Sequence, residues 1–437
     1  MADIVFSRSL PVRYDVDVLV MGGGPAGCAA AIAAARQGAK VLLVEGQAAL
    51  GGMGTTGMIP AFMTFGDGEH FLAAGLGREF LDRMWAIGGV TAGHGMSYSI
   101  RAEALKRAYD EMVSEAGVEL LLMTRLTAVE TKGRRIEYCV LASQRGMYAA
   151  KAKVYIDCTG DGSLAAWAGA PCEMGDENGT CMPATLCGLW SDIDFARRTI
   201  RDDSRIQEAY DDGVFEKLDL HFSGMWQIYD HVGGSNTGHA FDVDATDETS
   251  LTEALVYSRR LYAQIERYYH EYIPGFENAR LVATAGLMGI RESRRIVGEY
   301  VLNMDDYLAR RSFPDEIGRY CYNVDIHPSA RNREAFEAFK RVFEGKRYKP
   351  GESYGVPFRV LLPKGVDNLL VAGRCISTDR PMQSSMRVMP GCYITGQAAG
   401  VAAGLCVKGG FLPHDADVSA VRRELAGMNM YLPDARE

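Results

Sequence analysis

The sequence predicts an α/β fold in which a domain of parallel strands and helices is interrupted by a second, inserted domain. Residues 16–45 alternate strand, glycine-rich turn, small-residue helix and strand. An apolar strand returns late, at Leu361 to Ala372, and a final helix from about Gly391 through Cys406 follows it. From about Ala170 through Tyr272 the chain instead contains acid-rich helical segments with many tyrosines and arginines. A chain of 437 residues also exceeds one ordinary core, so two domains are expected.

The first turn has the glycine spacing of a dinucleotide site. Gly22, Gly24 and Gly27 form G-x-G-x-x-G directly after the first strand. The first glycine allows a tight turn, the second lets a pyrophosphate approach the backbone, and the third lets helix and strand pack closely. The helix that follows points free N–H groups and its positive dipole end at the phosphates. Glu45, 18 residues after Gly27, stands where a carboxylate accepts the ribose hydroxyls of an adenosine.

Hydrophobic periodicity predicts the remaining elements. Apolar residues recur every three or four positions in one helix, which a glycine closes, and short apolar runs bounded by turn residues indicate strands. These elements are a helix at Arg101 to Ala116, strands at Val118 to Met123 and Leu126 to Glu130, a meander at Arg135 to Leu141 and Met147 to Ile156, a strand within Pro183 to Trp190, and a strand and helix around Ile290 to Leu302.

A second glycine-rich stretch after Glu45 indicates which dinucleotide is bound. Gly46 and the pair Gly51-Gly52 suit a loop that passes close to a second, bulkier group. A nicotinamide enzyme does not need a second glycine-rich loop at this point. The chain resembles the FAD-dependent oxidoreductases of the two-dinucleotide-binding-domain flavoprotein superfamily, and most of all their broad FAD-dependent oxidoreductase group. Four segments carry the resemblance, in the order of the family: Val18 to Thr56, Val154 to Ala165, Gly286 to Gly298, and Val356-Pro-Phe-Arg359 through Gly400.

The resemblance implies a Rossmann-like FAD-binding domain of the glutathione-reductase type with an inserted α+β substrate or cap domain. Residues 1–170 and 350–437, together with roughly 280–302, would form the discontinuous FAD domain. Residues 171–349 would form the cap over the flavin.

The resemblance also implies where FAD lies. A strand ending at Gly373 and Arg374 would contact the ribityl and pyrophosphate groups, and the helix opening at Pro390 would point its N-terminus at the N1–C2=O edge, where reduced flavin is negative. Many relatives carry Gly-Asp instead of Gly-Arg here, so Asp379 or Asp161 could supply the missing carboxylate. The expected FAD contacts are Gly22, Gly24, Pro25, Ala26, Gly27, Glu45, Gly46, Gly52, Met53, Thr55, Leu126 (equally compatible with a plain sheet strand), Thr159, Gly160, Gly373, Arg374, Pro390 and Gly391.

Two residues are candidates for the chemistry. Arg387 precedes the flavin-facing helix and could anchor an anionic substrate bidentately, or form a structural salt bridge. His327, with Asp325 to orient it, is the best candidate for a general base, although a histidine that only caps a turn before Pro328 would look the same. Arg291, Arg294 and Arg359 form a wider basic set around the family-matched segments, which would suggest a carboxylate-bearing substrate if they converge in one cavity. His94 is a loop histidine that could face the flavin.

Three functional classes follow. A second G-x-G-x-x-G after a strand is missing from the middle of the sequence, so a dedicated NAD(P)H domain is not expected. The favoured class is a dehydrogenase or reductase that acts on a small, anionic metabolite by hydride transfer at flavin N5, with His327 taking the proton. The alternatives are a monooxygenase that uses transiently bound NAD(P)H and a non-catalytic FAD-binding protein. The electron acceptor or donor stays open.

Composition excludes other classes. A net charge of −9 without a long basic run argues against nucleic acid as a partner. The ten cysteines include no C-x-x-C pair, so neither a redox disulfide nor a bound metal is expected. The first residues do not read as a signal peptide and no apolar stretch is long enough to span a bilayer, so the expectation is a cytoplasmic protein with no membrane partner. A homodimer is expected only because it is a common state of soluble enzymes.

Overall fold

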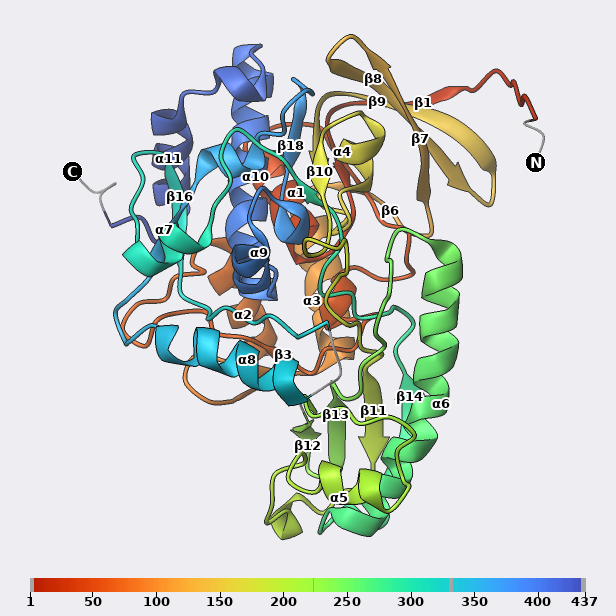
Figure 1. The fold of residues 1–437 in the computed structure, drawn as a ribbon. Helices are drawn as coiled ribbons and strands as arrows, with labels where there is room; N and C mark the ends of the chain where they lie inside the picture. The colour runs from red at the N-terminus through yellow and green to blue at the C-terminus, as the bar shows by residue number, and fades with distance from the viewer. Residues whose placement is uncertain (1–3, 223, 330–332, 434–437) are drawn as a thin grey trace.

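A seven-stranded sheet forms the centre of the computed structural model, which describes residues 4–222, 224–329 and 333–433 (Figure 1). Its order is β6-β2-β1-β9-β8-β7, and β18 also pairs with β9. Five of these strands run parallel, whereas β9, β8 and β7 form an antiparallel meander. The strands are β1 (Val12–Met21), β2 (Val41–Val44), β6 (Glu119–Leu121), β7 (Arg125–Lys132), β8 (Arg135–Ser143), β9 (Gly146–Asp157) and β18 (Leu369–Val371).

The carboxyl ends of three parallel strands meet at one edge of this sheet. Met21 of β1 pairs with Asp157 of β9, and Asp157 pairs with Val371 of β18. The late strand predicted from the sequence therefore joins the first one through the end of the meander. The turns that follow these three strands lie side by side.

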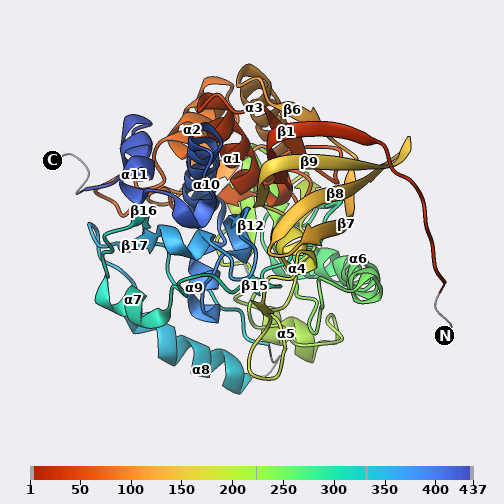
Figure 2. The same ribbon diagram turned by 90° about the horizontal axis from the view of Figure 1, so that it is seen from above.

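The predicted strand–helix–strand unit is confirmed. Helix α1 (Pro25–Arg36) joins β1 to β2, whose residues pair in parallel from Val18 with Val41 onward. Most of α1 is alanine and is buried, because one side faces the sheet and the other faces α10 (Met389–Gly409), the predicted final helix. An added Cβ would lie 2.2 Å from the carbonyl oxygen of Ala26 at Gly396, and 2.2 Å from that of Ala30 at Gly400. The two helices therefore touch backbone to backbone, side by side as Figure 2 shows.

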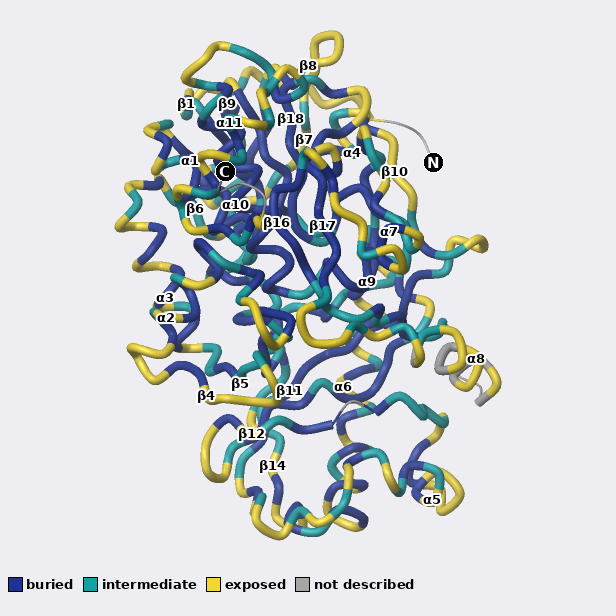
Figure 3. The backbone as a smooth tube through the Cα atoms, turned by 90° about the vertical axis from the view of Figure 1, so that its left-hand side faces the viewer, coloured by how far each residue is buried: buried dark blue, intermediate teal, exposed yellow. Residues whose placement is uncertain are grey.

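Several smaller elements complete the first hydrophobic cluster, which takes residues from 16–182 and 296–432. Figure 3 shows α10, β16 and β17 as largely buried, with exposed residues concentrated on outer loops and outer helices. These elements are α2 (Leu76–Ala86), α3 (Ala102–Glu115), α4 (Ser163–Trp167), α7 (Met304–Ala309), α8 (Arg333–Phe343), α9 (Arg380–Met386), α11 (Val418–Gly427), β3 (Ala61–Phe62), β4 (Val90–Ala92), β5 (Tyr98–Ile100), β10 (Cys172–Glu173), β15 (Arg295–Ile296), β16 (Glu316–Tyr320) and β17 (Tyr354–Pro357).

A second hydrophobic cluster takes residues from 184–288. It is built on a four-stranded antiparallel sheet of order β12-β13-β11-β14, against which α6 packs, and it forms the lower part of the molecule in Figure 1. The division of the chain at the expected domain boundaries stays a prediction. The elements are β11 (Gly188–Ser191), β12 (Met225–Tyr229), β13 (Val232–Ser235), β14 (Arg280–Thr284), α5 (Ile206–Asp211) and α6 (Glu248–Tyr272).

The prediction of a helix around Ile290 to Leu302 is wrong. This segment is extended, and β15 is its short strand. The buried carboxylate of Glu292 binds Arg295 at 2.5 Å and Arg380 at 2.9 Å, so side-chain contacts rather than helical hydrogen bonds hold the backbone here. Among the described residues, no helix is both long enough and apolar enough to cross a membrane.

We predict that Gly396→Ala lowers the free energy of unfolding by about 1–3 kcal/mol, because the methyl group must push α1 and α10 apart. Urea unfolding of the purified chain measures this. Gly427→Ala is the matched control, since a Cβ at Gly427 in α11 meets nothing within 4 Å. Equal stability of the two variants would contradict the close packing of α1 on α10.

Candidate functional site

The three motif glycines each meet a different steric condition. Gly22 has φ +95°, and a Cβ there would lie 2.5 Å from the carbonyl oxygen of Cys158. A Cβ at Gly27 would lie 1.8 Å from the carbonyl oxygen of Gly22. At Gly24, by contrast, an added Cβ meets nothing within 4 Å. The chain itself therefore requires glycine at Gly22 and Gly27, whereas the space beside Gly24 is open to a ligand, as a pyrophosphate requires.

The N-terminus of α1 opens onto the same space. Gly24 is the N-cap of α1 and Pro25 is its first residue, so no capping side chain covers the N–H groups of the first turn, those of Ala26 and Gly27 included. These groups and the helix dipole make an anion site. The residues at this edge of the sheet therefore fit the pyrophosphate of a dinucleotide.

Glu45 lies at the end of β2, next to this turn. Its Oε2 accepts a hydrogen bond from the backbone N–H of Gly23 at 2.7 Å, and its Oε1 accepts one from Gln47 at 2.7 Å. Two backbone donors therefore orient the carboxylate beside the phosphate turn, where a ribose is expected. A Cβ added to the next residue, Gly46, would lie 3.6 Å from the side chain of Arg125. The start of β7, near Leu126, therefore borders the expected ribose position.

The glycine-rich loop after Glu45 folds back over the phosphate turn. Gly51 donates its N–H to the carbonyl of Gly23 at 2.8 Å, and a Cβ at Gly52 would lie 3.4 Å from Cα of Gly24. Thr55 fastens the loop by a hydrogen bond from Oγ1 to the carbonyl of Leu50. The next residues lie against the second cluster, since a Cβ at Gly289 would come 3.3 Å from Cε of Met53. The loop therefore joins the nucleotide edge to the second cluster.

Arg374 lies over the turn that follows β9. Its Nη2 binds Oδ1 of Asp161 at 2.7 Å, its Nη1 donates to Oγ of Ser293 at 2.9 Å, and an added Cβ on Gly160 would lie 2.9 Å from Nη2. Thr159, beside Gly160, donates both its N–H and its hydroxyl to buried Asp157. A positive charge therefore stands at the sheet edge, held by a carboxylate.

The two acids considered as a replacement for the family's ribityl carboxylate lie in different places. Asp161 is at the sheet edge, paired with Arg374. Asp379 instead caps α9, where it accepts from the N–H of Met382 at 2.8 Å, and it also accepts from Met304 at 2.7 Å. Asp161 is therefore the better placed of the two.

The N-terminus of α10 adjoins the sheet edge. The helix begins at Met389, and Pro390 occupies its first turn. The N–H of Gly373, after β18, donates to Oγ1 of Thr395 in α10 at 3.0 Å. A Cβ at Gly391 would lie 2.6 Å from the carbonyl oxygen of Met386, so this glycine allows α9 and α10 to approach closely. The expected flavin-facing helix therefore starts where the β18 turn and α9 meet.

Arg387 and His327 are brought together by Asp325. Nη2 of Arg387 binds the carbonyl of Asp325 at 2.8 Å and its Oδ2 at 3.0 Å, while Oδ1 lies 3.6 Å from Nε2 of His327. The Arg387 side chain is only 7% exposed, and its Nη1 has no hydrogen-bond partner within residues 4–222, 224–329 and 333–433. Buried polar groups are normally hydrogen-bonded, so this N–H is available to a bound ligand.

Arg291 adds a second buried cation. It donates through Nη1 to the carbonyl of Pro183 at 2.9 Å and to Oγ1 of Thr185 at 2.7 Å. Burial, and then the positive charge of nearby Arg387, lower the pKa of Arg291 to about 10. It therefore stays charged at neutral pH, so two buried cations, Arg291 and Arg387, lie close to the carboxylate of Asp325.

The other expected basic residues and His94 lie elsewhere. Arg359 forms an ion pair with Asp315 at 2.9 Å, and Arg294 reaches the carbonyl of Asp161 at 3.4 Å. His94 is exposed in the turn between β4 and β5. The wider basic set therefore reduces to Arg291 and Arg387.

Three further residues surround His327 that the sequence did not single out. Nδ1 of His327 lies 3.0 Å from Nε2 of His239, whose Nδ1 lies 2.9 Å from Asp219, and the ring of His221 stacks on that of His327 with centroids 4.0 Å apart. Burial first, and then the charge of Arg291, lower the pKa of His327 well below 6.5. His327 is therefore a neutral imidazole at pH 7. One sequence signal could have indicated this group. The chain has only eight histidines, and two of them, His221 and His239, lie within a span of 19 positions.

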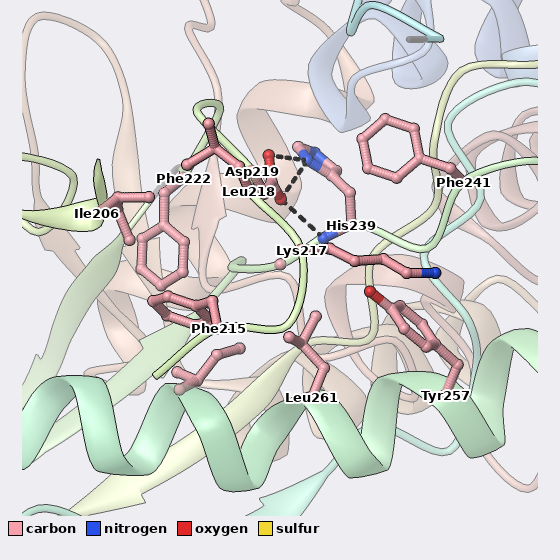
Figure 4. Close-up of a pocket in the computed structure, with 12 residues that line it drawn as sticks. Ile206, Phe215, Lys217, Leu218, Asp219, Phe222, His239, Phe241, Tyr257 and Leu261 are labelled. Atoms are coloured by element: carbon pink, nitrogen blue, oxygen red, sulfur yellow. Dashed lines mark hydrogen bonds and ion pairs between the residues drawn. The ribbon is translucent and has the colours of Figure 1, made fainter. Parts of the chain in front are cut away.

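A small pocket in the second cluster is lined by one of these histidines, His239 (Figure 4). Asp219 and His239 form part of its wall, and the rest is mainly apolar, with Phe215, Tyr257 and Leu261 among its residues. All ten cysteines are free thiols, and within the described ranges no group of three or more potential ligands could hold a metal ion.

Comparison with known proteins identifies the family. The family model described as FAD dependent oxidoreductase matches residues 17–425. A p-nitrophenol 4-monooxygenase from Pseudomonas putida has a similar structure, with a TM-score of 0.51 at 11% identity over 95% of this chain and 84% of that one. A geranylgeranyl bacteriochlorophyll reductase-like protein from Thermoplasma acidophilum gives 0.49 at 11% identity over 95% and 87%. At 11% identity the likeness to the monooxygenase shows the fold alone. No curated protein sequence matches.

We predict that Gly24→Ala weakens FAD binding at least about tenfold, a loss of about 1.4 kcal/mol, without lowering the stability of the apoprotein. The added methyl group meets no protein atom within 4 Å but occupies the approach of the pyrophosphate. Fluorescence quenching of FAD titrated into apoprotein measures the affinity, and urea unfolding of the apoprotein checks the fold. Unchanged FAD affinity would place the pyrophosphate elsewhere.

Proposed function

Because the chain belongs to the FAD-dependent oxidoreductase family, we propose that it is an FAD-dependent dehydrogenase of a small, anionic metabolite. The bound FAD supplies a two-electron acceptor that takes hydride at N5. The observation that carries this proposal is the uncommitted Nη1 of Arg387, which is buried immediately before the N-terminus of α10.

Arg387 is proposed to bind the anionic group. Its Nε and Nη2 are held by the carbonyl of Ser384 and by Asp325, so the direction of Nη1 is set before any ligand arrives. Leaving a buried donor unpaired costs about 1–3 kcal/mol, which a carboxylate would offset by accepting its hydrogen bond. Arg291 contributes a second positive charge to the same region.

His327 is proposed as the general base. As hydride leaves a substrate carbon, the attached hydroxyl or amino group loses a proton, and a neutral imidazole can accept it. The low pKa of His327 keeps the imidazole neutral at pH 7. The 3.6 Å between its Nε2 and Asp325, the partner of Arg387, supports a role beside the anion anchor.

An anaerobic titration of the purified FAD-loaded chain tests the proposal by following flavin absorbance. The expected result is bleaching by a member of a panel of hydroxy acids and amino acids, and none by uncharged sugars. Bleaching by NADH or NADPH alone would contradict dehydrogenation and favour the monooxygenase. Inertness to every compound would favour a non-catalytic FAD-binding protein.

We predict that Arg387→Lys raises the half-saturating concentration of the bleaching acid at least about tenfold, because an ammonium cannot reproduce the planar fork that holds both Asp325 and the substrate. Initial bleaching rates at varied acid concentration measure this. Arg359→Lys is the matched control, since Arg359 pairs with Asp315 outside this group. A similar effect of both substitutions would remove Arg387 from the anion site.

We predict that the bleaching rate at saturating acid stays constant as the pH falls from 8 to 6.5 and decreases only below 6.5. Only the neutral form of His327 can accept a proton, and its lowered pKa keeps it neutral until the solution is more acidic than its ordinary pKa. The neighbouring His221 also stays neutral, because burial and His239 lower its pKa to about 3. A midpoint at or above pH 6.5 would contradict a buried histidine base.

A further inference from the structure

A chain of hydrogen bonds runs through the second cluster to His327. Asp219 is bound to Nδ1 of His239 at 2.9 Å, as Figure 4 shows, and Nε2 of His239 lies 3.0 Å from Nδ1 of His327. The exposed fractions of the three side chains are 19%, 2% and 5%. The proposed dehydrogenation assigns no role to Asp219 or His239, although both are placed to act on the base.

Asp219 determines which way the hydrogen bonds point. Burial opposes its ionisation, but its contacts with His239 and the N–H of His221 outweigh burial and hold the pKa of the carboxyl below its usual range. An ionised carboxylate only accepts, so Nδ1 of His239 carries the proton. If His239 is a neutral imidazole, with one donor and one acceptor, its Nε2 accepts and Nδ1 of His327 donates. The lone pair of His327 is then on Nε2.

The orientation of that nitrogen agrees with this assignment. Nε2 of His327 faces the carboxylate of Asp325 at 3.6 Å, which is longer than a hydrogen bond. No hydrogen bond to Asp325 therefore holds a proton on Nε2. His221 lies parallel to the ring of His327 at an interplanar angle of 7°, which fixes the plane in which the lone pair points.

We propose that Asp219 and His239 are positioning residues that hold His327 in the tautomer with its basic nitrogen at Nε2, on the side of Arg387. This inference rests on the proposed role of His327 as the base. The chain presents the lone pair to the substrate before binding, so no ring flip or tautomer exchange precedes proton transfer. The same effect on a triad histidine is exerted by its carboxylate partner.

Nitrogen-15 NMR of the full FAD-loaded chain, labelled at histidine side chains and free of substrate, tests the tautomer directly. The coupling between two nitrogens across the His239–His327 hydrogen bond identifies the pair without mutation. The expected result is a protonated Nδ1 and an unprotonated Nε2 on His327. A proton on Nε2, or the absence of the coupling in the folded chain, would overturn the proposal.

Variants add a second readout. Asp219→Asn should produce a mixture of tautomers at both histidines, because an amide can donate as well as accept, and His239→Gln should do so at His327. His231→Gln is the matched control, since His231 is exposed and its Nδ1 bonds the backbone carbonyl of Ile193, away from His327. An unchanged His327 tautomer in folded Asp219→Asn and His239→Gln would remove both residues from this role. Flavin bleaching is measured separately. The proposed function fails if no acid bleaches the flavin, whatever the tautomer, and the positioning role fails if the tautomer is wrong, whatever the bleaching.

Discussion

The contact between α1 and α10 is the constraint on which the rest of the structure depends. Gly396 and Gly400 bring α10 against the carbonyl groups of Ala26 and Ala30, and any side chain at these positions would separate the helices. Because α1 begins at the phosphate turn and α10 begins beside α9, this contact sets the distance between the two ends of the expected cofactor site. The late strand β18 then pairs with β9, so chain segments more than 200 residues apart share one sheet edge.

The second cluster contributes residues that contact Arg291 and His327, which the sheet edge does not provide. The loop after β13 carries His239, and the segment before β11 carries Pro183 and Thr185, which bind Arg291. Arg387, at the end of α9, and Asp325 belong to the later part of the chain. Two arginines, one of them with an unpaired Nη1 among the described residues, therefore lie with a buried histidine and the carboxylate of Asp325 where the two parts of the chain meet. The proposed anchor Arg387 and the proposed base His327 both come from the later part of the chain, whereas His239, which contacts that base, comes from the second cluster.

Local signals in the sequence predicted the nucleotide half well. The glycine spacing, the alanine-rich helix and the strand at 369–371 depend on neighbours in the chain, so the pattern alone indicates them. The helix expected around Ile290 to Leu302 failed because Glu292 binds Arg380, a partner 88 positions away that no local pattern contains. Asp219 and His239 were missed for the same reason, since their connection to His327 spans 88 residues between the two histidines.

For single side chains too, expectations based on neighbours in the sequence fared better than those based on distant segments. Asp325 was expected to orient His327 because it is two residues away, and the structure places the two 3.6 Å apart. The convergence of arginines was an assumption about distant segments, and Arg359 does not take part because Asp315 binds it. Residue type and local spacing therefore indicate candidates, whereas tertiary contacts decide which of them meet.

A crystal structure of the FAD-bound chain with oxalate would test the central claim most directly, because oxalate is an anion that cannot donate hydride from a C–H bond. We expect one oxalate carboxylate within hydrogen-bond distance of Nη1 of Arg387, next to Nε2 of His327. Oxalate bound elsewhere, or Nη1 of Arg387 taken up by the cofactor itself, would contradict an anion anchor at this site.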